Sequence, residues 1–152
     1  MDSEEKQENE RLKHLEFIEG TISRMNQCSF NLKGWAVGLT SALIGFFASN
    51  LSSLAFPTWI YTAIIIIPIV IFWALDSFYL QQERKFRDLY NDVAHLHPAR
   101  SIRAFDMSLS RYKGNRCSYI ENFFSKTEFG FYGFIILLII GIAAAIDQPL
   151  SR

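Results

Sequence analysis

Two long segments without a charged side chain constrain the fold of this chain more than any other feature. Residues 34–75 are 42 consecutive residues without Asp, Glu, Lys, Arg or His, and residues 129–146 are another 18. A helix needs about 20 apolar residues to cross a bilayer. The first segment is long enough for two helices and the second for one. The sequence therefore predicts an all-α integral membrane protein with three transmembrane helices, at about residues 34–50, 58–78 and 129–147.

The distribution of basic residues predicts the orientation of these spans. Five basic residues precede the first span and nine lie between the second and third, whereas the turn after the first span has none and the tail has one. Basic residues concentrate in cytoplasmic flanks. We therefore expect a multi-pass protein with a cytoplasmic N-terminus and an external tail at residues 148–152. The acidic composition of residues 1–20 argues against a secretory signal peptide.

Apolar periodicity extends the first two spans beyond the membrane. Phe72, Tyr79, Phe86 and Val93 recur every seven residues, and a second seam of steps of three and four runs from Leu15 to Leu39. Such seams pack against another helix. We expect a long helical hairpin extended into the cytosol, with a cytosolic amphipathic helix at 1–33, the hairpin at 34–80 and a helical extension with a basic loop at 81–128. The seam at 72–96 packs either on the N-terminal helix or on a second copy of itself.

Small residues four apart mark the first span. Small side chains let helices approach closely in lipid, which favours a packed interface, and polar members of the same set could instead line a pore. Both alternatives stay open. The candidate pore or packing residues are Thr40, Ser41, Gly45, Ser49 and Asn50.

Five further residues are candidates for a hinge or a helix interface. Pro68 removes a backbone hydrogen bond within the second span and is expected to kink it. Asp76 falls near the inner surface of the bilayer, where Lys33 lies at the matching depth of the first span. A pairing of Asp76 with Lys33 is favoured over a proton relay, because the sequence suggests one such acid only. Tyr79 and Phe86 lie on the seam.

The cytosolic loop carries a cluster of basic residues separated by aromatic residues. Basic and aromatic side chains together suit phosphates and stacked bases, and they also suit anionic lipid headgroups. Both partners stay open. The candidate ligand-binding residues are Arg100, Arg103, Arg111, Lys113 and Arg116.

The sequence contains no recognisable catalytic constellation. His95 and His97 lack a third ligand at metal-binding spacing, and Cys28 and Cys117 are expected to be reduced thiols. The zero net charge argues against a protein that binds nucleic acid through overall positive charge. We expect no enzymatic activity, no metal and no cofactor.

Two stretches resemble a family of small bacterial membrane proteins. ISRMNQCSFNLKGWAVGL, at residues 22–39, and PIVIFWALDSFYLQQERKFRDLY, at residues 68–90, are similar to the membrane effectors of anti-phage defence, of the Hailong type. The resemblance implies a homo-oligomeric pore in the bacterial inner membrane that depolarises the membrane when it is opened by an oligonucleotide or cyclic-nucleotide ligand made by a partner nucleotidyltransferase. The alternative is a membrane-anchored scaffold or regulatory subunit that docks a soluble partner through its cytosolic helices.

Overall fold

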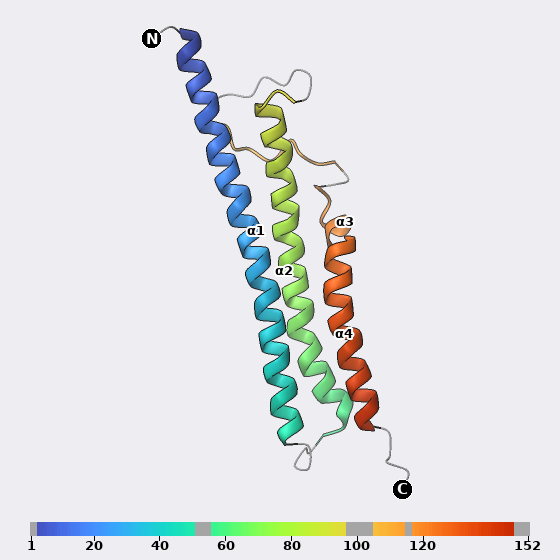
Figure 1. The fold of residues 1–152 in the computed structure, drawn as a ribbon. Helices are drawn as coiled ribbons and strands as arrows, with labels where there is room; N and C mark the ends of the chain where they lie inside the picture. The colour runs from blue at the N-terminus through green and yellow to red at the C-terminus, as the bar shows by residue number, and fades with distance from the viewer. Residues whose placement is uncertain (1–2, 51–55, 97–104, 115–116, 148–152) are drawn as a thin grey trace. The chain divides into compact units, whose positions relative to one another are not determined.

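The computed structural model describes residues 3–50, 56–96, 105–114 and 117–147 (Figure 1). Every regular element among these residues is a helix: α1 (Ser3–Ser49), α2 (Thr58–Val93), α3 (Tyr119–Phe123) and α4 (Lys126–Asp147). α1, α2 and α4 are long and apolar enough to cross a membrane. The predicted all-α class and the three candidate spans are therefore confirmed. The predicted external tail lies outside the described residues.

The ends of α1 and α2 are capped by local hydrogen bonds. At the end of α1 the side chain of Asn50 donates to the carbonyl of Phe46 at 2.8 Å. After α2, the N–H of Leu96 donates to the carbonyl of Asn91 at 2.9 Å, and His95 adopts a φ of 56°. This is the Schellman arrangement, in which the residue after the helix enters the left-handed region that glycine usually occupies. α2 therefore ends in a helix cap whose left-handed residue is His95 and not a glycine.

The chain divides into two compact units, and α1 and α2 contribute to both. We call Phe30–Ser77 with Phe123–Arg152 the apolar unit, and Met1–Ser29 with Phe78–Asn122 the polar unit. The apolar unit and the polar unit each have a hydrophobic cluster of their own. Each unit is therefore described by itself.

The core of the apolar unit is formed by α1, α2 and α4, which lie side by side there (Figure 1). Its buried residues are Ala36 from α1, Ile65, Ile69 and Trp73 from α2, and Tyr132 and Ile139 from α4. The indole of Trp73 stacks on Tyr132 with ring centroids 5.9 Å apart and donates to the carbonyl of Phe123 at 3.0 Å. Aromatic packing and one indole hydrogen bond thus fix the first turns of α4 and the residue Phe123 before it against α2.

The core of the polar unit joins α1 and α2 to the segment that follows α2. Ile18 from α1 and Leu89 from α2 are almost fully buried, and Tyr112 and Cys117 cover them from the loop. The phenol of Tyr112 donates to Asp92 at 3.0 Å. The loop that the sequence marks as basic is therefore also anchored by a buried apolar and aromatic contact.

The predicted seams agree only partly with burial in a single chain. In the seam from Leu15 to Leu39, Ile18 and Ala36 are fully buried, and in the seam at 72–96 Leu89 and Val93 are buried. Leu75, which follows Phe72 by three residues, is 44% exposed. The seam at 72–96 thus packs in the polar unit, and in the apolar unit Ile65, Ile69 and Trp73 of α2 are buried instead.

Candidate functional site

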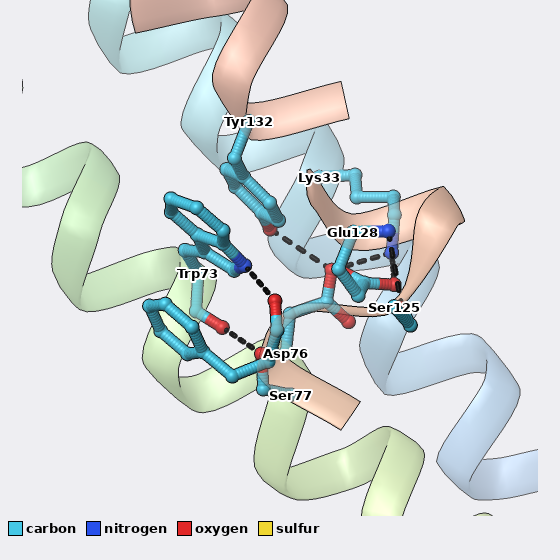
Figure 2. A network of polar contacts seen from close by, with 8 residues as sticks. Lys33, Trp73, Asp76, Ser77, Ser125, Glu128 and Tyr132 are labelled. Carbon is cyan, nitrogen blue, oxygen red and sulfur yellow. Dashed lines mark hydrogen bonds and ion pairs between the residues drawn. The ribbon is translucent and has the colours of Figure 1, made fainter. Parts of the chain in front are cut away.

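The most unusual site is a cluster of ionisable side chains in the apolar unit, two buried acids and a half-buried lysine, which we call the charge cluster. Lys33 of α1 pairs with Asp76 of α2 and with Glu128 of α4, the second pair at 3.0 Å between Nζ and Oε1. The phenol of Tyr132 donates to Oδ2 of Asp76 at 2.9 Å (Figure 2). Asp76 is fully buried and Glu128 is 2% exposed. Each of the three long helices therefore contributes one ionisable side chain to the charge cluster.

The start of α4 determines the position of Glu128. Ser125 precedes the helix, and its hydroxyl oxygen accepts a hydrogen bond from the N–H of Glu128 at 3.3 Å. A Ser followed by Glu three residues later is the capping-box sequence, in which the Glu side chain normally bonds back to the first residue. Here the Glu128 carboxylate meets Lys33 instead (Figure 2). A helix-start motif thus supplies one acid of the charge cluster.

Sequence reasoning found two members of the charge cluster and missed the third. The expected meeting of Lys33 with Asp76 is present. Glu128 was not singled out, although a signal for it exists. Lys33 immediately precedes one charge-free segment, Asp76 immediately follows it, and Glu128 immediately precedes the other. For three spans of alternating direction, these positions are on one side of the bilayer.

The predicted pore or packing residues differ in exposure within the single chain. Thr40 is buried, whereas Ser41, Gly45 and Ser49 are exposed. A Cβ placed on Gly45 would meet no atom within 4 Å. The line of small residues therefore does not face the other helices of the same chain.

The remaining hinge or interface candidates lie along α2. Pro68 stands inside the helix, which continues on both sides of it. Tyr79 and Phe86 are half-buried, and Phe86 packs against the core of the polar unit. Neither contributes to the charge cluster.

The predicted ligand-binding residues are described only in part. Arg111 is exposed and lies 3.7 Å from Asp106, and Lys113 is exposed. Arg100, Arg103 and Arg116 lie outside the described residues. Convergence of the five basic residues therefore stays a prediction.

A polar groove of about 510 Å³ lies in the polar unit. Its lining mixes charge, aromatic surface and amide groups, and it comes from both α1 and α2. The side of α2 also carries an ion pair between Arg87 and Glu83, at 2.6 Å. The lining residues are Glu19, Ile22, Arg84, Arg87, Asp88, Tyr90 and Asn91. Sequence reasoning missed this groove, because its residues are shared between two helices far apart in the chain.

His14 is a buried ionisable group of the polar unit. It is 2% exposed, and its ring lies 5.9 Å from that of Phe105. Burial lowers the pKa of His14, and a hydrogen bond to the backbone of Asp106 and the charge of Asp106 act in the opposite direction. The neutral imidazole is therefore favoured in the folded polar unit.

Among residues 3–50, 56–96, 105–114 and 117–147, no three His, Cys, Asp or Glu side chains are grouped so as to hold a metal ion. The charge cluster has two carboxyl groups, but a lysine lies between them and the third group is a phenol. Cation binding by this donor set would have to compete with Lys33.

The helices and the charge cluster define the chain as a helical protein with three candidate membrane spans and a buried ionisable site. No family model, curated protein or solved structure matches it. Its function therefore has to be inferred from its own residues.

Proposed function

We propose that this chain is a membrane effector of bacterial anti-phage defence, a homo-oligomeric pore in the inner membrane that a nucleotide-type signal opens. The charge cluster is the observation that carries the proposal. Ionisable groups within membrane helices are costly and mark ion pathways or moving parts. Lys33, Asp76 and Glu128 come from three different helices. A change in helix packing would thus break a strong interaction at one defined point.

The topology in this proposal is a helical hairpin of α1 and α2 extended into the cytosol, with the N-terminus inside. Its support is the excess of basic residues before the first span and between the second and third. The polar unit would then be the cytosolic part. Because α1 and α2 contribute to both units, a ligand that favours one packing of the polar unit could bias the apolar unit.

Oligomer formation is supported by the outward line of small residues on α1. Ser41, Gly45 and Ser49 are exposed in the single chain, and such lines favour close helix contacts in lipid. Three helices packed around Ile69, Trp73 and Tyr132 fill their own centre with side chains. A conducting path would therefore lie between copies.

The ligand in this proposal is an oligonucleotide or cyclic nucleotide made by a partner nucleotidyltransferase. The polar groove has the volume of a small-molecule site and carries Arg84, Arg87 and Tyr90, residue types that suit phosphate and base. Arg111 and Lys113 add exposed positive charge in the same unit. The groove and the five basic loop residues are thus the two places to test for ligand contact.

The test is membrane potential in bacteria that express the chain with its genomic neighbours, read with a potential-sensitive dye during phage challenge. We expect loss of potential only when both neighbours and phage are present. Alanine at Arg100, Arg103, Arg111, Lys113 and Arg116 should abolish this response while the oligomer still assembles. The matched control carries Lys6→Ala and Lys13→Ala, which remove exposed basic residues of α1. A potential that holds in cells that still block phage would contradict the pore.

A second candidate is a membrane-anchored scaffold that docks a soluble partner through the polar unit. The observation that favours it is exposed apolar surface on that unit: Leu12 is 54%, Phe17 62% and Phe105 48% exposed. Large exposed apolar side chains can mark a protein interface. Replacing Leu12 and Phe17 by Ser should release the partner in a pull-down and leave the membrane potential unchanged. A pull-down unaffected by these changes would count against the scaffold.

A further inference from the structure

The charge cluster contains two acids and one base. Lys33 pairs with Asp76 and with Glu128, and it is the only cation paired with either carboxyl group among the described residues. The other titratable group that contacts the two acids is the phenol of Tyr132 on α4, which is neutral. With both carboxyl groups ionised, one lysine and two carboxylates leave one negative charge without compensation. An uncompensated buried charge is strongly destabilising.

Two carboxyl oxygens of the charge cluster have no hydrogen-bond partner in the described protein. They are Oδ1 of Asp76 and Oε2 of Glu128, and both are buried. Oδ2 of Asp76 and Oε1 of Glu128 both contact Nζ of Lys33, so the two carboxyl groups lie close together around one ammonium group. Two carboxylates repel at this distance, whereas a carboxylic acid donates a hydrogen bond to a carboxylate. The geometry therefore has a place for one proton.

The hydrogen bonds distinguish the two acids. Oδ2 of Asp76 accepts bonds from both Lys33 and Tyr132, whereas Glu128 accepts from Lys33 at one oxygen (Figure 2). Hydrogen bonds donated to a carboxylate favour its ionised form. The ionised acid is therefore Asp76, and the proton belongs to Glu128.

We propose that Asp76 and Glu128 form a proton-binding site, in which the Glu128 carboxylic acid donates to the Asp76 carboxylate and the charge cluster is neutral. The site is independent of the pore proposal, since it requires only the contacts within the apolar unit. When the proton leaves, the cluster gains one negative charge between three helices. Packings that admit water to the cluster then become more favourable, so proton release and separation of α1, α2 and α4 are coupled.

The test is the infrared C=O stretching band of a protonated carboxyl group in the full chain, reconstituted in lipid nanodiscs at neutral pH. We expect one such band, which shifts when glutamate is labelled with ¹³C and disappears at alkaline pH. Absence of the band at neutral pH would overturn the proposal, and so would a band that shifts only with labelled aspartate. Because these measurements use the wild-type sequence, they do not depend on the folding of any variant.

Variants give an independent readout. Glu128→Gln should remove the band completely and make the stability of the apolar unit insensitive to alkaline pH, whereas the wild type loses stability as pH rises. Glu121→Gln changes an exposed glutamate and should behave like the wild type. Equal alkaline sensitivity in Glu128→Gln would overturn the proposal. Stabilisation of the wild type at alkaline pH by sodium, and not by an organic cation at the same ionic strength, would assign a metal cation in place of the proton and overturn it as well.

Discussion

The two units each bury an aspartate that accepts a hydrogen bond from a tyrosine, but they surround it differently. In the apolar unit Tyr132 donates to Asp76 at 2.9 Å, and a lysine and a second acid complete the site. In the polar unit Tyr112 donates to Asp92 at 3.0 Å near the end of α2, beside the exposed His95. Where lipid replaces water, charge must be balanced inside the protein. Comparing the two sites therefore separates the contribution of the hydrogen bond to stability from the contribution of its surroundings.

The largest expected effect comes from removing the only cation of the charge cluster. Lys33→Met leaves Asp76 and Glu128 without a cation, and removing one member of a buried ion pair costs about 3–5 kcal/mol. Reversible unfolding in bicelles measures the loss. Lys126→Met removes an exposed lysine of α4 and should change stability by less than about 0.5 kcal/mol. A small loss in Lys33→Met would mean that the two acids ionise little in its absence.

The second prediction compares the two tyrosines directly. Tyr132→Phe removes a hydrogen bond to a buried carboxylate and should cost about 1.5–3 kcal/mol, the range for bonds to charged groups. Tyr112→Phe removes the same chemistry in the polar unit and should cost about 0.5–1.5 kcal/mol, because Asp92 is 8% exposed whereas Asp76 is fully buried. Each value is measured as the unfolding free energy of the unit concerned, by hydrogen exchange. Equal costs would show that the surroundings do not matter.

The third prediction concerns acid sensitivity of the polar unit. Burial lowers the pKa of His14, so the unfolded chain binds more protons than the folded one below the ordinary histidine pKa of 6.5. Stability is present in full above that value and is lost as pH falls, by at most about 1.4 kcal/mol per pH unit. Hydrogen exchange of residues around Ile18 from pH 7 to pH 5 measures the loss. In His14→Phe the slope should disappear, and persistence of the slope would assign it to another group.

The smallest effect is expected at the end of α2. His95 has a φ of 56°, a conformation that is unfavourable for residues with a Cβ. His95→Gly should stabilise the polar unit by less than about 1 kcal/mol, because glycine relieves this strain while the entropy that it adds to the unfolded chain offsets part of the gain. Denaturant unfolding measures the gain, with His14→Gly as the contrasting variant, which should lose stability. A loss in His95→Gly would mean that the imidazole makes a contact of its own.

The sequence predicted the spans because lipid imposes a strict rule on composition. Residues 34–75 and 129–146 exclude charge, and helices of the expected length are found there. Lys33 and Asp76 were predicted to meet because each lies at the edge of a charge-free segment. Glu128 obeys the same rule at the start of the second charge-free segment, but it was not singled out from the sequence.

The loop after α2 was harder to predict from sequence. Its basic residues suggested a ligand site, while the structure shows Tyr112 and Cys117 packed on Ile18 and Leu89. No periodicity links a loop residue to its partner on a helix, so such contacts leave no pattern in the sequence. The polar groove was missed for the same reason, since Glu19 and Arg84 belong to helices that only folding brings together.

The composition of the charge cluster also bears on how the chain enters a bilayer. Helices insert into lipid as separate units and associate afterwards. Lys33 and Asp76 form a neutral pair as soon as the first two spans meet, so these two helices can rest in lipid before synthesis of the third is complete. Glu128 arrives last and brings the excess acid. If Glu128 carries the proposed proton, α4 would enter the bilayer with this carboxylic acid uncharged, and the assembled bundle would keep that proton.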